Sequence, residues 1–299
     1  MLIAGRHWLC VFRAMNENTI KNVRIVKDVQ AMSGDQLCSM QIHAVKFDGK
    51  FLPVVEKKYK FEFIGDSITS GEGAIGAKAE EDWIPMWFSA LINYSAMTAE
   101  AMNAEYRIIS QSGWGLLTGW DNNPHANIPE YYDKVCGLLT GEKNENLGAF
   151  KENDFTSWQP DVVIVNLGTN DSGAFNSPQW RDEVTGETCK QRLNDDGTFN
   201  EEDLEAFKEA AVQFLTKLRK YNKKAHIIWA YGMLGMPMMA AVYHAIDVYT
   251  KKTGDKKVSV IELPNTTEET LGARSHPGML SHENSAKVLT TYIKEILAK

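Results

Sequence analysis

Short, largely apolar runs alternate with longer helical patterns from residue 61 onward. The runs have the length of strands and lie at residues 61–64, 106–110, 162–166, 226–230 and 258–262. Strands that alternate with helices are typical of a parallel sheet covered on both faces. We therefore expect residues 61–299 to form one α/β domain.

Two of the intervening segments carry clear helical stripes. Asn200 precedes three acids, the pattern of an N-cap followed by a negatively charged first turn. Apolar residues then recur at helical spacing, at Leu204, Phe207, Ala211, Phe214, Leu215 and Leu218. The last segment repeats the spacing at Val288, Leu289, Tyr292, Ile293, Ile296 and Leu297. We interpret both stripes as core packing rather than functional sites.

Residues 1–60 show a different pattern, in which apolar and polar positions alternate as in strands. The alternation is clearest at residues 8–12 and 23–26, and turn residues follow at 15–18, 33–35 and 48–49. The sequence therefore predicts a small β-rich domain over residues 1–60.

Composition narrows the classes of partner. The 299 residues are 43% hydrophobic and 24% charged, and the net charge of −7 argues against nucleic acid or an anionic membrane as the main partner. No run approaches the roughly 18 apolar residues of a membrane span, and the start shows no basic segment followed by an apolar stretch. We expect a soluble chain without a visible signal peptide.

Cysteine and histidine usage gives no support for a metal or cofactor. The cysteines lie far apart, at Cys10, Cys38, Cys136 and Cys189, and fit a reducing compartment such as the cytoplasm. The seven histidines form no metal-binding pattern. Gly71, Gly73 and Gly76 match a dinucleotide-binding pattern, but the preceding strand stops near Ile64 and no acidic residue ends a second strand about 20 residues later. We expect no bound nucleotide.

The most informative motif follows the run at 61–64, where Gly65-Asp66-Ser67 forms a turn that can expose a serine hydroxyl. Three later segments carry possible partners: residues 109–115 with Gly113, 162–171 with Asn170, and 274–277 with His276. Each segment alone could be an ordinary turn or surface residue. Together and in this order they supply a nucleophile, a base and hydrogen-bond donors for an oxyanion.

These four blocks resemble those of the SGNH (GDSL-type) hydrolases. The resemblance covers about residues 61–297 and implies a three-layer α/β/α, flavodoxin-like sandwich. The chain is most similar to carbohydrate esterase family 2, whose members carry a jelly-roll domain ahead of a Gly-Asp-Ser-Ile-Thr block and remove acetyl groups from sugars. About 60 residues are too few for a complete jelly roll, so we expect a shortened one, or strands that lean on the larger domain or on another subunit.

The resemblance assigns a role to each matching residue. Ser67 would attack an ester carbonyl, His276 would accept its proton, and Gly113 and Asn170 would donate to the oxyanion. Most relatives have an aspartate two or three residues before the histidine, whereas this chain has Arg274 and Ala273. We therefore predict a Ser67–His276 dyad in which the second ring nitrogen of His276 donates to a main-chain carbonyl. His282 is the reserve candidate for the base.

Long loops at 111–130 and 172–199 follow two of these blocks and are expected to shape a substrate pocket. Trp114 and Trp180 are the candidate substrate-binding residues, and Trp120 lies close by; an indole can stack on a sugar ring or simply pack. The leading hypothesis is a serine esterase that removes short acyl groups, in particular acetyl, from a carbohydrate. Another SGNH activity (lysophospholipase, thioesterase or short-chain esterase) and a degenerate sugar-binding module are the alternatives. The sequence leaves the oligomeric state open.

Overall fold

The computed structural model describes residues 5–16, 18–32, 35–38 and 40–298. It divides into two units, one of Met1–Lys27 with Met40–Val55 and a larger one of Asp28–Ser39 with Glu56–Lys299. The candidate residues all belong to the larger unit.

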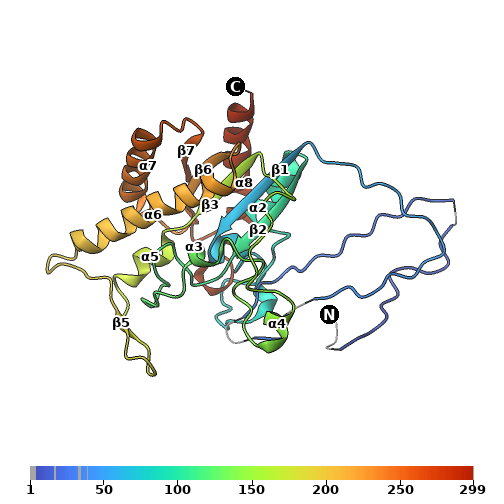
Figure 1. Ribbon diagram of the computed structural model, residues 1–299, viewed down its shortest axis with the longest axis horizontal. Helices are drawn as coiled ribbons and strands as arrows, with labels where there is room; N and C mark the ends of the chain where they lie inside the picture. Colours follow the sequence, from blue (N-terminus) through green and yellow to red (C-terminus); the bar gives the residue numbers. More distant parts are fainter. Residues whose placement is uncertain (1–4, 17, 33–34, 39, 299) are drawn as a thin grey trace. The chain divides into compact units, whose positions relative to one another are not determined.

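A five-stranded parallel sheet forms the centre of the larger unit (Figure 1). Its spatial order is β2 (Ala104–Ser110), β1 (Tyr59–Gly65), β3 (Val162–Asn166), β6 (His226–Gly232) and β7 (Val258–Leu263). All five predicted strands are present, with ends shifted by two residues or less. This order is that of a flavodoxin-like sheet, which confirms the predicted α/β fold.

Helices cover both faces of the sheet (Figure 1). On one face, α6 (Glu201–Tyr221) and α7 (Met239–Thr253) pack on a core that includes Val163, Val165 and Trp229. On the other face, α2 (Tyr94–Ala101) and α8 (Met279–Leu297) pack on a core that includes Phe63, Ile164 and Ile228. Successive β3 residues therefore enter opposite cores, as the pleat of a strand covered on both faces requires.

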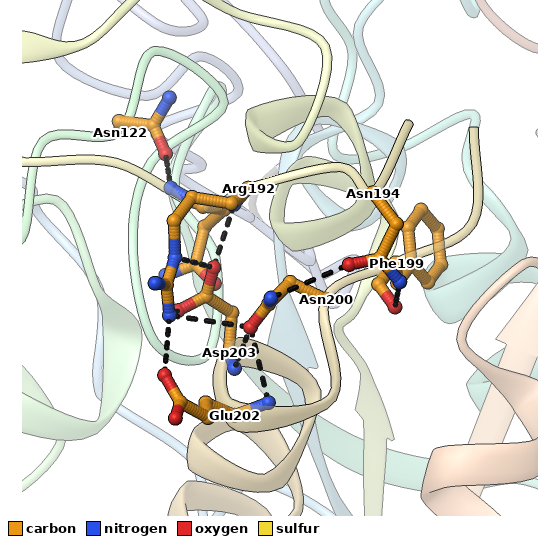
Figure 2. Close-up of polar contacts among 8 residues, drawn as sticks. Asn122, Arg192, Asn194, Phe199, Asn200, Glu202 and Asp203 are labelled. Carbon is orange, nitrogen blue, oxygen red and sulfur yellow. Dashed lines mark hydrogen bonds and ion pairs between the residues drawn. The ribbon is translucent and has the colours of Figure 1, made fainter. Parts of the chain in front are cut away.

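The predicted start of α6 is confirmed. The Asn200 side chain accepts hydrogen bonds from the backbone N–H groups of Glu202 and Asp203. Figure 2 shows Arg192, from the preceding loop, donating to the Asp203 carboxylate at 2.8 Å and to Glu202 at 2.9 Å. The loop that leads into α6 is thus fastened to the first turn of the helix.

The helical stripes were predicted with one error. In α6 the residues Phe207, Ala211, Phe214, Leu215 and Leu218 are buried. In α8, Leu289 and Ile293 are fully buried, but Val288 is exposed. Val288 lies about 100° from Leu289 around the helix, on the side away from the buried Thr290 and Ile293, so it falls at the exposed edge of the buried face.

Short elements complete the larger unit. They are α1 (Ser67–Ser70), η1 (Pro85–Trp87), α3 (Ile128–Tyr131), α4 (Glu142–Asn146), α5 (Thr169–Ala174), the antiparallel pair β4 (Trp180–Arg181) and β5 (Thr188–Cys189), and η2 (Ala273–Ser275). The loops predicted at 111–130 and 172–199 contain α3 and the β4–β5 pair. Among the described helices, none has the length and apolar character needed to cross a bilayer.

The alternating pattern before residue 59 gives no strand in the described part of that range. Many apolar side chains in this range are exposed; Trp8, for example, is 73% exposed and Val54 is 90% exposed. Alternation fixes which side chains share a face, whereas a strand also needs a neighbour that supplies hydrogen bonds. Asp28 belongs to the larger unit, where its carboxylate accepts from Ser89 Oγ and Leu91 N. The domain boundary at residue 60 stays a prediction.

Candidate active site

The candidate nucleophile lies where β1 ends. Asp66 is the N-cap of α1, and its Oδ1 accepts from Ile68 N at 3.0 Å, which starts a helical turn with Ser67 as its first residue. Ser67 is 5% exposed. β3 ends beside β1 and leads through Gly168 into α5, which carries Asn170. Both segments therefore reach the same carboxyl edge of the sheet, where flavodoxin-like folds bind ligands.

His276 lies directly against Ser67. Its Nε2 is 2.9 Å from Ser67 Oγ, although 209 positions separate the two residues. This distance is that of a hydrogen bond between a hydroxyl and an imidazole. The structure thus brings together the two residues for which the sequence predicted a nucleophile and a base.

The second ring nitrogen of His276 faces the main chain. Its Nδ1 lies 2.7 Å from the carbonyl oxygen of Arg274. The carbonyl reaches this place because Arg274 and Ser275 both have left-handed backbone angles, with φ of 57° and 54°. A carbonyl only accepts hydrogen bonds, so Nδ1 carries the proton and Nε2 is left to accept one from the serine. The predicted contact with a main-chain carbonyl is present.

His282, the reserve candidate, lies elsewhere. It is fully buried in α8, its Nδ1 accepts from Tyr94 N at 3.2 Å, and its ring stacks on the Tyr94 ring. Burial, with a smaller effect of the nearby His276, lowers the pKa of His282 to about 3. A histidine that stays neutral and is bonded to the core is a structural residue.

Gly73 explains the glycine pattern that resembles a nucleotide-binding motif. It has φ of 75°, and a Cβ there would lie 2.7 Å from His276 Cβ and 2.6 Å from the Ala273 carbonyl oxygen. Only a glycine allows the turn after Ser67 to approach the His276 segment so closely. Gly73 therefore serves the close packing of the two blocks, whereas a Cβ at Gly71 would meet the Ser89 carbonyl oxygen.

The two predicted oxyanion donors lie on neighbouring segments. Gly113 has φ of 79°, and a Cβ there would lie 3.1 Å from Trp120 Cδ1. Asn170 Nδ2 donates to Asp66 Oδ2 at 3.2 Å and to the Trp114 carbonyl oxygen at 2.9 Å. The amide nitrogen therefore points to the Ser67 turn, and both of its hydrogens have partners in this structure.

Asp171 holds the loop that carries these groups. Its carboxylate is fully buried and accepts from the backbone N–H groups of Leu116, Leu117 and Thr118 at 2.7–3.3 Å. Asp66 and Asp171 therefore both accept hydrogen bonds from main-chain amides of the site loops.

The tryptophans differ in exposure. Trp114 is half-buried and its ring packs on Tyr131, and Trp180 packs edge-on against His125. Trp120 is 56% exposed beside Gly113. A cleft of about 250 Å³ is lined by Trp114, His125, Gln111, Gln36 and neighbouring residues. Substrate binding by Trp114 and Trp180 stays a prediction.

Comparison with known proteins identifies the family. Residues 61–289 match the family model described as GDSL-like lipase/acylhydrolase. The chain belongs to this family. The GDSL-like assignment agrees with the resemblance that the four sequence blocks indicated.

Several known proteins are similar to this GDSL-like chain. An acetyl xylan esterase from the rumen bacterium Butyrivibrio proteoclasticus is 52% identical, with a TM-score of 0.83 over 85% of this chain and 68% of its own. A family two carbohydrate esterase from Clostridium thermocellum, solved in complex with cellohexaose, is 26% identical, with a TM-score of 0.66 over 83% and 67% of the two chains. An acetylxylan esterase/glucomannan deacetylase from Cellvibrio japonicus is 34% identical over 41% of this chain and 32% of its own. The chain spans between 26% and 44% of the length of the curated relatives that it matches.

One residue of the GDSL-like site has no signal in the sequence. Glu72 is 2% exposed, pairs with Arg274 Nε at 2.7 Å, and places its other oxygen 3.8 Å from His276 Nε2. Sequence spacing could not reveal Glu72, because its partner Arg274 lies 202 positions away. Among the described residues, no group of three His, Cys, Asp or Glu side chains is arranged to hold a metal ion.

The buried Asp66 should make stability depend on pH. Burial, together with the negative charges of Asp171 and Glu72, raises its pKa to about 7, against about 3.9 in an unfolded chain. The folded state therefore keeps a proton that the unfolded state has released. The resulting stabilisation is fully present below about pH 4 and is lost as the pH rises to about 7.

We expect Asp66→Asn to flatten this dependence by up to about 1.4 kcal/mol per pH unit between pH 4 and 7. The measurement is the free energy of unfolding in urea at several pH values. Asp195→Asn, at an exposed position, is the control and should keep the wild-type slope. An Asp66→Asn protein with the wild-type slope would contradict the assignment.

Proposed function

We propose that the chain is a serine esterase that removes acetyl groups from an acetylated carbohydrate. The observation that carries the proposal is the 2.9 Å contact between Ser67 Oγ and His276 Nε2, with the Arg274 carbonyl behind the ring. The 52% identity to an acetyl xylan esterase supports acetyl as the acyl group and a polysaccharide as the alcohol.

The first half of the reaction uses the dyad. Ser67 Oγ attacks the acetyl carbonyl carbon while its proton passes to His276 Nε2. The tetrahedral oxyanion is stabilised by the N–H of Gly113 and the amide of Asn170. The C–O bond to the sugar then breaks, and His276 gives its proton to the departing sugar oxygen. Acetyl remains on Ser67.

Water completes the cycle. His276 takes a proton from a water molecule, whose oxygen attacks the acetyl carbon. The second tetrahedral intermediate then collapses: the bond from the acetyl carbon to Ser67 Oγ breaks, His276 Nε2 returns its proton to Ser67 Oγ, and acetate leaves. During both halves the His276 ring is transiently positive, and the Arg274 carbonyl accepts its Nδ1–H throughout.

Asn170 must change its bonding in this scheme. Its hydrogen bond to Asp66 is the longer of the two, at 3.2 Å, so this N–H is the one that can redirect its hydrogen bond to the oxyanion. The Trp114 carbonyl oxygen continues to accept the other hydrogen bond and so holds the amide in place.

The test is release of acetate by the purified chain. We expect activity on acetylated xylan or glucomannan and on nitrophenyl acetate, falling as the acyl chain of the nitrophenyl ester lengthens. Higher rates on long acyl chains or acyl thioesters would favour another activity of the GDSL-like family. Saccharide binding without any acetate release would favour a sugar-binding module.

A further inference from the structure

Glu72 connects the serine segment to the histidine segment. Its backbone N–H donates to the Ser67 carbonyl oxygen at 3.0 Å, so its place is fixed relative to the nucleophile. Its side chain is 2% exposed and pairs with Arg274 Nε at 2.7 Å. A carboxylate buried this deeply is retained only where a charged or hydrogen-bonded partner compensates its desolvation.

Arg274 is held at three points. Besides the Glu72 carboxylate, its Nη1 donates to the Glu81 carbonyl oxygen and its backbone N–H to the Glu80 carbonyl oxygen, both at 2.7 Å. These contacts keep a left-handed residue in a conformation that non-glycine residues adopt only where the surroundings impose it. That same conformation aims the Arg274 carbonyl at His276 Nδ1.

The second carboxylate oxygen of Glu72 faces the other side of the imidazole. It lies 3.8 Å from His276 Nε2, which is too far for a hydrogen bond but close enough for attraction to a positive ring. Glu72 therefore does not compete with Ser67 for Nε2, which is 2.9 Å from the serine oxygen.

We propose that Glu72 is a positioning residue that does, from the opposite side of the ring, what an aspartate at Nδ1 does in a Ser-His-Asp triad. Through Arg274 it fixes the carbonyl that receives the Nδ1–H, and its charge stabilises the imidazolium formed when Ser67 attacks. The inference rests on the proposed esterase function, since it assumes that His276 is the base.

The test is Glu72→Gln, which keeps the shape of the side chain and removes its charge. We expect kcat on nitrophenyl acetate to fall roughly ten- to a hundredfold, the range for residues coupled through one network, with KM changed less than about threefold. Glu81→Gln is the matched control: it removes an exposed carboxylate from the segment that binds Arg274 and leaves the carbonyl that Arg274 uses.

A second variant separates positioning from folding. Arg274→Gly tolerates the left-handed backbone but removes the ion pair, so it tests the same link without a buried substitution. Kcat should fall in this variant too, and the double variant should be no slower than the slower single one, because both changes break one link. The proton resonance of His276 Nδ1–H should shift in both single variants, which a purely structural role would not require.

The role proposed for Glu72 and the proposed esterase function can fail separately. If the wild-type chain releases no acetate, the proposed function fails and the inference fails with it. If the wild type is active and Ser67→Ala is not, a folded Glu72→Gln protein with the kcat of Glu81→Gln overturns the inference alone. An effect confined to KM would also overturn it.

Discussion

Ser67→Ala should abolish ester hydrolysis in a chain that still folds. Removing the nucleophile of a serine hydrolase typically lowers kcat by a factor on the order of 10⁴ to 10⁶, because the donors that remain cannot replace the covalent step. The fold should persist, since the cap of α1 is the Asp66 side chain and Ser67 Oγ contacts His276. The measurement is acetate release from acetylated xylan together with thermal unfolding.

Ser70→Ala is the matched control for this variant. Ser70 lies in the same short helix, is equally buried, and bonds Ser110 Oγ at 2.8 Å instead of the histidine. Its loss should cost about 1 kcal/mol of stability and leave kcat near the wild-type value. Turnover by Ser67→Ala at the level of Ser70→Ala would remove Ser67 from the reaction.

Asn170→Ala should lower kcat by about 100- to 1000-fold, the effect of removing one oxyanion donor. The substrate gains little from this amide before the carbonyl becomes an oxyanion, so KM should change much less. Kinetics on nitrophenyl acetate separate the two constants. Asn176→Ala, which removes an exposed amide just beyond α5, should behave like wild type.

The hydrogen-bond partners of Asn170 add an expected effect on stability. Its amide already donates to Asp66 and to the Trp114 carbonyl, so its removal also leaves a buried carboxyl with one contact fewer. Some loss of stability should therefore accompany the loss of kcat, and it should be measured separately. A change in KM alone would make Asn170 a substrate-positioning residue.

The sheet could be predicted from the sequence because its three central strands, β1, β3 and β6, are largely buried on both faces. A run such as 162–166 has no residue that solvent must reach, and all five of its residues are buried. That Ser67, Gly113, Asn170 and His276 lie at the same edge of the sheet could likewise be predicted, because each follows a strand or lies in a loop near that edge. Here local pattern and tertiary structure agree.

The contacts that hold His276 in place could not be predicted in the same way. The ion pair of Glu72 with Arg274 joins residues 202 positions apart, and left-handed angles at Arg274 and Ser275 have no composition signal, since neither is glycine or asparagine. In the described part of residues 1–58 the alternating pattern occurs without a strand. This alternation is a genuine local signal, yet a strand also depends on a neighbour that the pattern does not specify.

The long sequence separation between Ser67 and His276 also affects when the active site forms during folding. Strands β2, β3, β6 and β7 all lie in the 209-residue interval, so we expect the histidine to reach the serine only after the sheet has formed and η2 has docked. Closing so long an interval is slow relative to forming local helices, and contacts of this range are among the last that a chain makes. After dilution from urea, the return of hydrolysis therefore times the docking of the last segment, while circular dichroism times the sheet and its helices.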